Sequence, residues 1–255
     1  MDILWTGVLA LLLIGYFALE GSGIGAGMLL PVLGRTQPDR DRVVAAMAPF
    51  VLANEVWLVA VAGVLFGAFP SIEGEVLSGL YPLVVTLLVS WILRDAGLWF
   101  RRRLDGHAWR AGWDWMICLG SYGLALSWGM ALVAMAGGLS GAPIGLPGLG
   151  GGLVVTAAFA LHGWTFLSWR LPGQVTGASR TGRALLASAG VAALPVAVLL
   201  AALAPWLLEH IAPSGTLNVL SVMILPFAPL MLGAQVWVWR TFNPRRATDR
   251  IPSFF

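Results

Sequence analysis

The sequence predicts an all-α, polytopic membrane protein, a bundle of about seven transmembrane helices. Hydrophobic residues make up 58% of the 255 residues and charged residues only 11%, and the mean hydropathy is +0.84. A soluble domain is far less apolar than this. A hydrocarbon core of about 30 Å needs roughly 20 apolar residues in a helix, and only helices or closed barrels satisfy backbone polar groups in lipid. Because the apolar runs are long and continuous, we predict helices.

The predicted spans are seven apolar runs, at roughly 3–32, 50–69, 76–100, 112–137, 150–170, 183–207 and 217–242. The first run is too long for a signal peptide and lacks a basic start and a cleavage site, so we predict a true span. We group the chain into an N-terminal four-helix bundle (1–137), a C-terminal three-helix segment (150–242) and a tail (243–255). The glycine-rich stretch 147–152 is predicted to be a flexible turn between two spans.

The distribution of charge predicts the orientation. All fifteen basic residues are arginines. Apart from Arg94, they gather after the first, third and fifth spans and in the tail: Arg35, Arg40, Arg42, Arg101, Arg102, Arg103, Arg110, Arg170, Arg180, Arg183, Arg240, Arg245, Arg246 and Arg250. The opposite loops carry only acids. By the positive-inside rule, we expect the N-terminus outside and the C-terminus in the cytoplasm, with the chain in the inner membrane. This sidedness accounts for the basic pI, so no nucleic-acid partner is predicted.

Three ionisable residues inside the spans are candidates for function, because such groups are costly to place in a membrane. Glu20 lies in the middle of the first span among glycines at 21, 23, 25 and 27, which predict close helix packing. Glu55 and Arg94 lie at similar depth in neighbouring antiparallel spans, so we predict a buried ion pair. Such a pair either neutralises two costly charges or lines a route for protons or quinone.

Other polar residues have simpler interpretations. His162 has no histidine partner at matching depth, so we predict a hydrogen-bonded side chain facing a neighbouring helix and no haem ligation. Asp114 is expected in the first turn of the fourth span, where an acid stabilises the helix dipole. Cys118 is expected to be a buried, inert thiol. We therefore predict no catalytic, cofactor-binding or metal-binding residues in this chain.

Short segments in fixed order carry a resemblance over most of the chain. They are Gly15-Tyr16-Phe17-Ala18-Leu19-Glu20-Gly21, Gly25-Ala26-Gly27-Met28, Asn54-Glu55-Val56-Trp57-Leu58, Ser78-Gly79-Leu80-Tyr81, Leu93-Arg94, Trp113-Asp114-Trp115, His162-Gly163 and Thr216-Leu217-Asn218-Val219. Together they resemble subunit II of cytochrome bd-type quinol oxidases. A set of motifs in fixed order is more specific than any single one.

The resemblance implies a subunit of a terminal oxidase that takes electrons from quinol and reduces oxygen to water. It implies that haem b, with or without haem d, is held by a larger partner, subunit I, which this chain supports and shields in the lipid bilayer. Small single-helix subunits are further candidate partners. The candidate residues for the interface or for a proton or oxygen route are Glu20, Asn54, Glu55, Trp57, Arg94, Asp114 and His162.

The chain also departs from the family pattern. The family usually has an acid where Gly23 stands, and Trp-Asp-Gly where Val51, Leu52 and Ala53 stand. Family members usually have two more spans in the C-terminal half. Two alternatives stay open: a small transporter or channel that uses Glu20, Glu55 and Arg94 as a polar pathway, and a relative that serves only in assembly.

Overall fold

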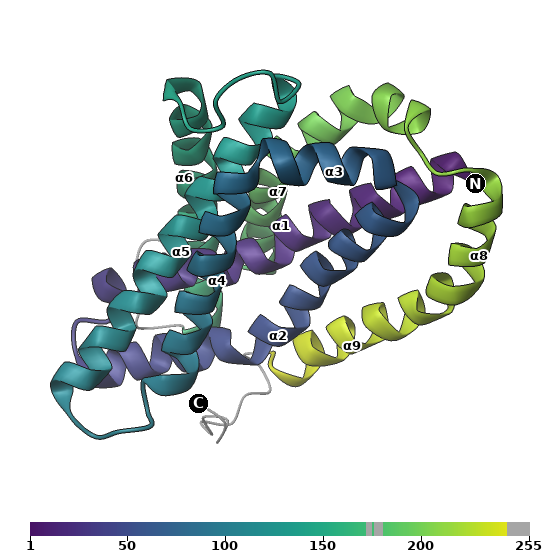
Figure 1. Ribbon diagram of the computed structural model, residues 1–255. Coiled ribbons are helices and arrows are strands. Elements are labelled where there is room, and N and C mark those ends of the chain that lie inside the picture. Colours follow the sequence, from purple (N-terminus) through teal and green to yellow (C-terminus); the bar gives the residue numbers. More distant parts are fainter. Residues whose placement is uncertain (172–174, 176–180, 244–255) are drawn as a thin grey trace.

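The structure is a computed structural model that describes residues 1–171, 175 and 181–243, and it is a bundle of long helices (Figure 1). Seven helical spans in this part of the chain are long and apolar enough to cross a membrane. The predicted fold class, an all-α bundle of about seven spans, is therefore confirmed. The tail from residue 244 onward, with Arg245, Arg246 and Arg250, lies outside the described residues, as does Arg180.

The helices follow one another with short connections. They are α1 (Asp2–Leu33), α2 (Gln37–Ala68), α3 (Pro70–Gly79), α4 (Tyr81–Phe100), α5 (His107–Ala136), α6 (Leu146–Arg170), α7 (Gly182–Glu209), α8 (Ser214–Ile224), the 3-10 turn η1 (Leu225–Phe227) and α9 (Ala228–Thr241). The seven spans are α1, α2, α4, α5, α6, α7 and the broken helix from α8 to α9.

Several helix boundaries differ from the prediction, three of them for clear local reasons. The second helix already begins at Gln37, because Thr36 and Asp39 form a capping box at its N-terminus. The third apolar run is divided into α3 and α4 at Leu80, with a proline in the first turn of each helix. The last span is interrupted by η1, which contains Pro226.

The prediction of a flexible turn at 147–152 is wrong. Helix α6 begins at Leu146, so this glycine-rich stretch forms its first turns. A Cβ atom at Gly129 of α5 would collide with the backbone of Gly151, and one at Gly152 would lie 3.1 Å from the carbonyl oxygen of Leu126. This stretch is therefore helical, and its glycines allow α5 and α6 to pack backbone against backbone.

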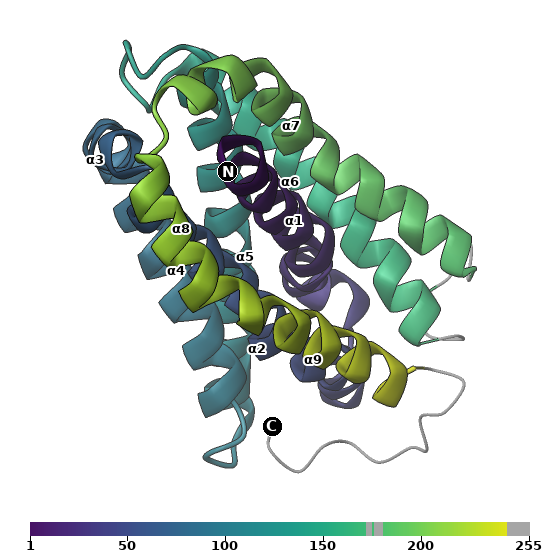
Figure 2. The same cartoon turned by 90° about the vertical axis from the view of Figure 1, so that its right-hand side faces the viewer.

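Helix α1 is the central element of the bundle, and it contacts α2, α5, α6 and α7 (Figures 1 and 2). A Cβ atom at Gly25 would collide with the carbonyl group of Phe159 in α6, and one at Gly163 would collide with the backbone of Gly25. A Cβ atom at Gly27 would collide with Ser121 in α5. The predicted close packing at the glycines of the first span is confirmed, and it involves two neighbouring helices.

The last span lies at the edge of the bundle, where α8 and α9 pass beside α2 (Figure 2). The Trp5 indole of α1 donates a hydrogen bond to Ser221 (3.2 Å), and Trp239 packs on Phe50 with ring centroids 4.8 Å apart. Most of its large side chains face outward; Val222 is 78% exposed and Leu230 is 70% exposed. In the membrane this surface meets lipid or another protein chain.

The contact between α1 and α6 gives a first prediction. Gly163→Ala should destabilise the protein by about 1–3 kcal/mol, because the added methyl group meets backbone atoms of Gly25 and Ala26 that cannot move aside independently. We would measure the midpoint of thermal unfolding of the purified protein in detergent.

The matched control is Gly190→Ala in α7, where nothing lies within 4 Å of the added methyl group. This exposed helical position should keep or slightly raise the midpoint, because alanine is the better helix former. Equal midpoints for the two variants would show that α1 and α6 are not packed through these glycines.

Candidate functional site: a buried arginine cluster

Arg94 lies in α4 and is only 1% exposed, although it sits in the apolar interior of the bundle. Glycines of α5 let the two helices approach closely at this position. A Cβ atom at Gly120 would lie 2.5 Å from the carbonyl oxygen of Ser90 and 2.8 Å from the backbone nitrogen of Arg94. The close packing of α4 and α5 therefore fixes the backbone from which the guanidinium group extends.

Carboxylates from three helices surround this guanidinium group. Its Nη1 atom donates to Glu20 of α1, and its Nη2 atom donates to Glu55 Oε1 of α2 over 2.7 Å. Its Nε atom donates to the neighbouring Asp95 of α4 over 3.1 Å. The predicted pair of Glu55 and Arg94 is confirmed. The sequence did not place Glu20 in the same cluster. A sequence indicates how deep a residue lies in the membrane, but not which neighbouring helix its side chain faces.

The two glutamates differ in their surroundings. Oε1 of Glu55 also accepts a hydrogen bond from the Trp91 indole (2.8 Å), whereas Oε2 of Glu20 is buried without a hydrogen-bond partner in the described part of the chain. A Cβ atom at Gly23 would lie 3.4 Å from both carboxylate oxygens of Glu20. Gly23 has no side chain and thus leaves space beside this carboxylate.

A chain of polar side chains joins the last span to the cluster. Asn54 donates to the carbonyl oxygen of Leu19, next to Glu20 (3.1 Å), and accepts from Gln235 of α9 (2.9 Å). Gln235 in turn accepts from the Trp57 indole (3.2 Å). Two of the predicted candidates, Asn54 and Trp57, therefore meet through Gln235. Our sequence reasoning missed this residue, although an amide within an apolar span was a signal for it.

Asp114 belongs to a second cluster, at the end of the bundle where α2 begins. Its two carboxylate oxygens accept from Arg101 Nε (2.9 Å) and from Arg40 Nη1 (3.1 Å), and Arg101 also pairs with Asp41 (2.6 Å). The prediction that Asp114 lies in the first turn of its helix is wrong, because α5 already begins at His107. Asp114 instead links α2, α4 and α5 through two arginines.

His162 of α6 lies apart from both clusters and is hydrogen-bonded through both ring nitrogens. Its Nε2 atom lies 2.9 Å from the carbonyl oxygen of Ala18, and its Nδ1 atom lies 2.8 Å from the Ser188 hydroxyl. A carbonyl oxygen can only accept, so Nε2 carries a proton and donates to Ala18, while the Ser188 hydroxyl also donates to the carbonyl oxygen of Leu185 (2.9 Å). The histidine thus ties α6 to α1 and α7, as the sequence predicted for a hydrogen-bonded side chain facing its neighbours.

The chemistry open to the Arg94 cluster follows from its charges. An arginine keeps its charge in proteins, whereas each of the three carboxylates can bind a proton. The cluster can therefore hold the helices together as an ion network, and it has the groups to take up a proton. Within residues 1–171 and 181–243 no three side chains of His, Cys, Asp and Glu are grouped to hold a metal ion.

The fold and these sites define a multi-pass helical membrane protein with a charge network at its centre. Residues 1–210 match the family model described as cytochrome bd terminal oxidase subunit II. Since this match covers most of the chain, the protein belongs to that family. The family that the sequence motifs indicated is therefore confirmed.

Curated relatives agree with this assignment. Subunit 2 of the cytochrome bd-I ubiquinol oxidase of Escherichia coli is 29% identical over 245 residues, which cover 84% of this chain and 62% of the relative. Subunit 2 of the cytochrome bd ubiquinol oxidase of Bacillus subtilis is 31% identical over 188 residues, which cover 69% of this chain and 56% of the relative. The chain thus spans about three fifths of the length of these relatives.

These findings also bear on the other expectations. Seven apolar spans and relatives from bacterial oxidases make the chain a multi-pass protein of the bacterial inner membrane. Neither the family model nor these relatives support the alternative of a small transporter or channel.

The cluster around Asp114 gives a second prediction. Asp114→Asn should lower the free energy of unfolding by about 3 kcal/mol, because Arg101 and Arg40 would face each other across a neutral amide in a buried site. The measurement is the thermal midpoint in detergent, with the fraction of monodisperse protein as a second readout.

Asp105→Asn is the matched control, since its side chain is fully exposed and pairs with Arg110 only at 3.5 Å. Its midpoint should stay near that of the unmodified protein. If Asp114→Asn were as stable as this control, the second cluster would not hold the three helices together.

Proposed function

We propose that this chain is the accessory subunit II of a bd-type terminal oxidase, an enzyme complex that oxidises quinol and reduces oxygen to water. The observation that carries the proposal is the match of residues 1–210 to the subunit II family. The names of the relatives add that they are subunits of ubiquinol oxidases. In this proposal the chain packs against a larger subunit I, and small single-helix subunits are further possible components of the complex.

We propose that the haem groups are held by the larger subunit. His162 does not fit an axial haem ligand, because both of its ring nitrogens are hydrogen-bonded, one to Ala18 and one to Ser188. An axial ligand to haem iron needs a free ring nitrogen. The redox step is therefore assigned to the partner, and this chain supports and shields it.

The orientation is part of the proposal. The N-terminus and α3 lie outside, and the connections at 34–36 and 101–106 lie in the cytoplasm, because these connections and the adjacent helix ends carry the arginines. The second cluster, with Arg40, Arg101 and Asp114, is then at the cytoplasmic end of the bundle, and Arg94 is deeper in the membrane.

In this proposal the Arg94 cluster is structural, and no proton route uses a carboxylate at position 52. Leu52 stands where the family has an acid, and its side chain is 60% exposed on the outer face of α2. Glu55, one turn further along, points inward to Arg94. A leucine cannot relay a proton, so Glu55 is the acid that the apolar part of α2, beyond Asp39 and Asp41, offers for that task.

The proposal is tested by purifying the complex from native membranes through a tag on this chain and recording its absorption spectrum. We expect haem absorption together with a larger copurifying protein, and quinol-dependent oxygen consumption. A stable preparation without haem and without a larger partner would contradict the proposed function.

The assignment of haem to the partner gives a third prediction. His162→Ala should leave the haem content per assembled complex unchanged, because the histidine connects α6 to α1 and α7 through hydrogen bonds. Assembly should fall, since Ala18 and Ser188 lose their partner. Loss of one whole haem from an otherwise intact complex would make His162 an iron ligand.

The structural role of Glu55 gives a fourth prediction. Glu55→Gln should lower the stability of the complex by at most about 3 kcal/mol, because Glu20 and Asp95 still neutralise Arg94. Oxygen consumption per assembled haem should change little. A well-assembled variant whose turnover collapses would show that Glu55 carries protons.

A further inference from the structure

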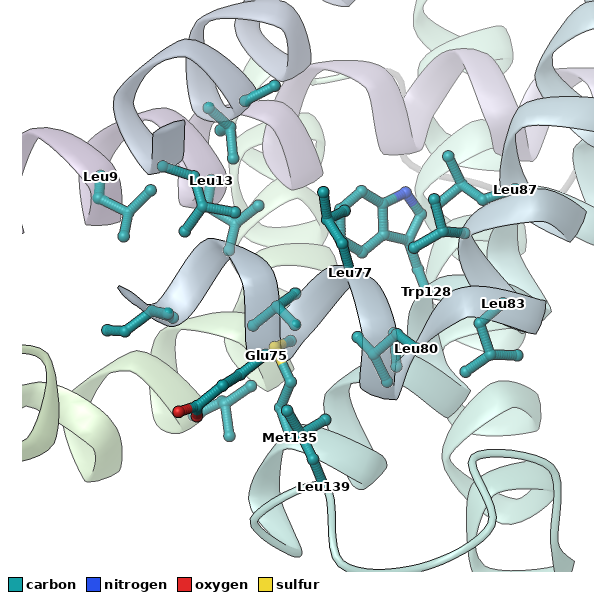
Figure 3. Close-up of a pocket in the computed structure, with 18 of the residues that line it drawn as sticks. Leu9, Leu13, Glu75, Leu77, Leu80, Leu83, Leu87, Trp128, Met135 and Leu139 are labelled. Carbon is teal, nitrogen blue, oxygen red and sulfur yellow. The ribbon is translucent and has the colours of Figure 1, made fainter. Parts of the chain in front are cut away.

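An apolar cavity of about 740 Å³ lies beneath α3 (Figure 3). Its walls come from α1, α2, α4, α5 and α7, with Leu13, Leu83, Trp128 and Met135 among the lining residues, and α3 contributes Leu77. The volume is within the range of about 300–1,000 Å³ typical of sites for small molecules. The cavity is separate from the contacts of the Arg94 cluster, but Trp91, which holds Glu55, forms part of its wall.

The lining selects an apolar occupant. Leucine, valine, alanine and other apolar side chains make up almost all of the wall, and Glu75 and Ser127 are its polar exceptions apart from the tryptophan indoles. Ser127 is buried in α5. Ordered water needs two to four polar partners, and a cavity lined by leucines stays dry or takes up hydrocarbon.

The cavity opens sideways, toward the bilayer. Val59 of α2 is 63% exposed and Leu88 of α4 is 47% exposed, and both belong to its lining. Since α2 and α4 are joined to opposite ends of α3, we place the opening between them. An occupant therefore enters from the hydrocarbon of the membrane, where acyl chains are the most abundant ligand.

The rim beneath α3 is acidic. Glu75 is exposed and its carboxylate points away from the apolar wall (Figure 3), and α3 carries Glu73 but no basic residue. A phosphate group alone would be repelled at this rim. A head group that ends in an ammonium group complements it, since an ammonium can pair with the Glu75 carboxylate.

We propose that this cavity binds one acyl chain of a phospholipid of the phosphatidylethanolamine type, with its ammonium group at Glu75. The chain fills the space between α2 and α4 and reaches toward Trp91. It thereby keeps water from the α3 side away from the indole that holds Glu55. This inference rests on the cavity and the membrane location, and it does not depend on the proposed oxidase function.

The test is photo-crosslinking in the intact protein, purified with the partners that accompany it. The probe is phosphatidylethanolamine with a diazirine in the middle of one acyl chain, in vesicles of phosphatidylethanolamine and phosphatidylglycerol. We expect labelled peptides that contain Leu77, Leu83 or Met135, identified by mass spectrometry. Label confined to outward-facing residues such as Val222 and Leu230 would overturn the proposal.

Two variants that fill the opening test whether the label depends on access to the cavity. Ala62→Phe and Leu88→Trp place a larger side chain at exposed positions of the lining, where little packing is disturbed. Each should reduce label in the cavity severalfold. The matched control is Ala202→Phe, at an exposed position of α7 outside the lining. This variant should leave the amount of label in the cavity unchanged. Unchanged label in both filled variants would overturn the proposal.

The head group is tested separately. A phosphatidylglycerol probe with the same diazirine should label the cavity roughly two- to fivefold less than the ethanolamine probe, as expected for one exposed ion pair. Glu75→Gln should remove this difference. Equal labelling by the two probes in the unmodified protein, or a quinone extracted from the cavity in place of phospholipid, would contradict the proposal.

Discussion

A guanidinium group is tolerated inside an apolar helical bundle only where carboxylates neutralise it, and Arg94 meets this condition with acids from three helices. Glu20 comes from α1, Glu55 from α2 and Asp95 from α4 itself. Since none of these helices can turn or slide without leaving a charge unpaired, the cluster fixes their mutual register. The polar chain through Asn54 and Gln235 extends this constraint to the last span, which otherwise has few buried side chains.

Helix α1 combines this charged contact with a contact of the opposite kind. Gly25 packs against the backbone of Phe159 and Gly163 in α6, and Gly21 packs against the Phe159 ring. Both contacts are short and allow little displacement. Close approach of the helices therefore helps to hold the bundle together, since lipid surrounds apolar side chains as well as protein does.

The sequence predicted what depends on depth and composition. Apolar runs of sufficient length indicated the seven spans, and the matching depths of Glu55 and Arg94 indicated their pairing. It did not predict what depends on direction around a helix or on where a helix begins. Glu20 faces Arg94 because of its rotation in α1. Asp114 lies beyond the first turn of its helix, because α5 already begins at His107. The glycine-rich stretch 147–152 forms part of a helix that packs closely on the backbone of α5, and a single sequence gives no sign of that neighbour.

The central claim is that Arg94 and its acids stabilise the bundle as one coupled unit. A double-mutant cycle with Arg94→Gln and Glu20→Gln, followed by thermal or denaturant unfolding, tests it most directly. Arg94→Gln alone should destabilise the protein by about 3–5 kcal/mol, because it leaves buried carboxylates unpaired. The account predicts that the double variant is more stable than Arg94→Gln. Losses that simply add would show that the two residues act independently and would contradict the account.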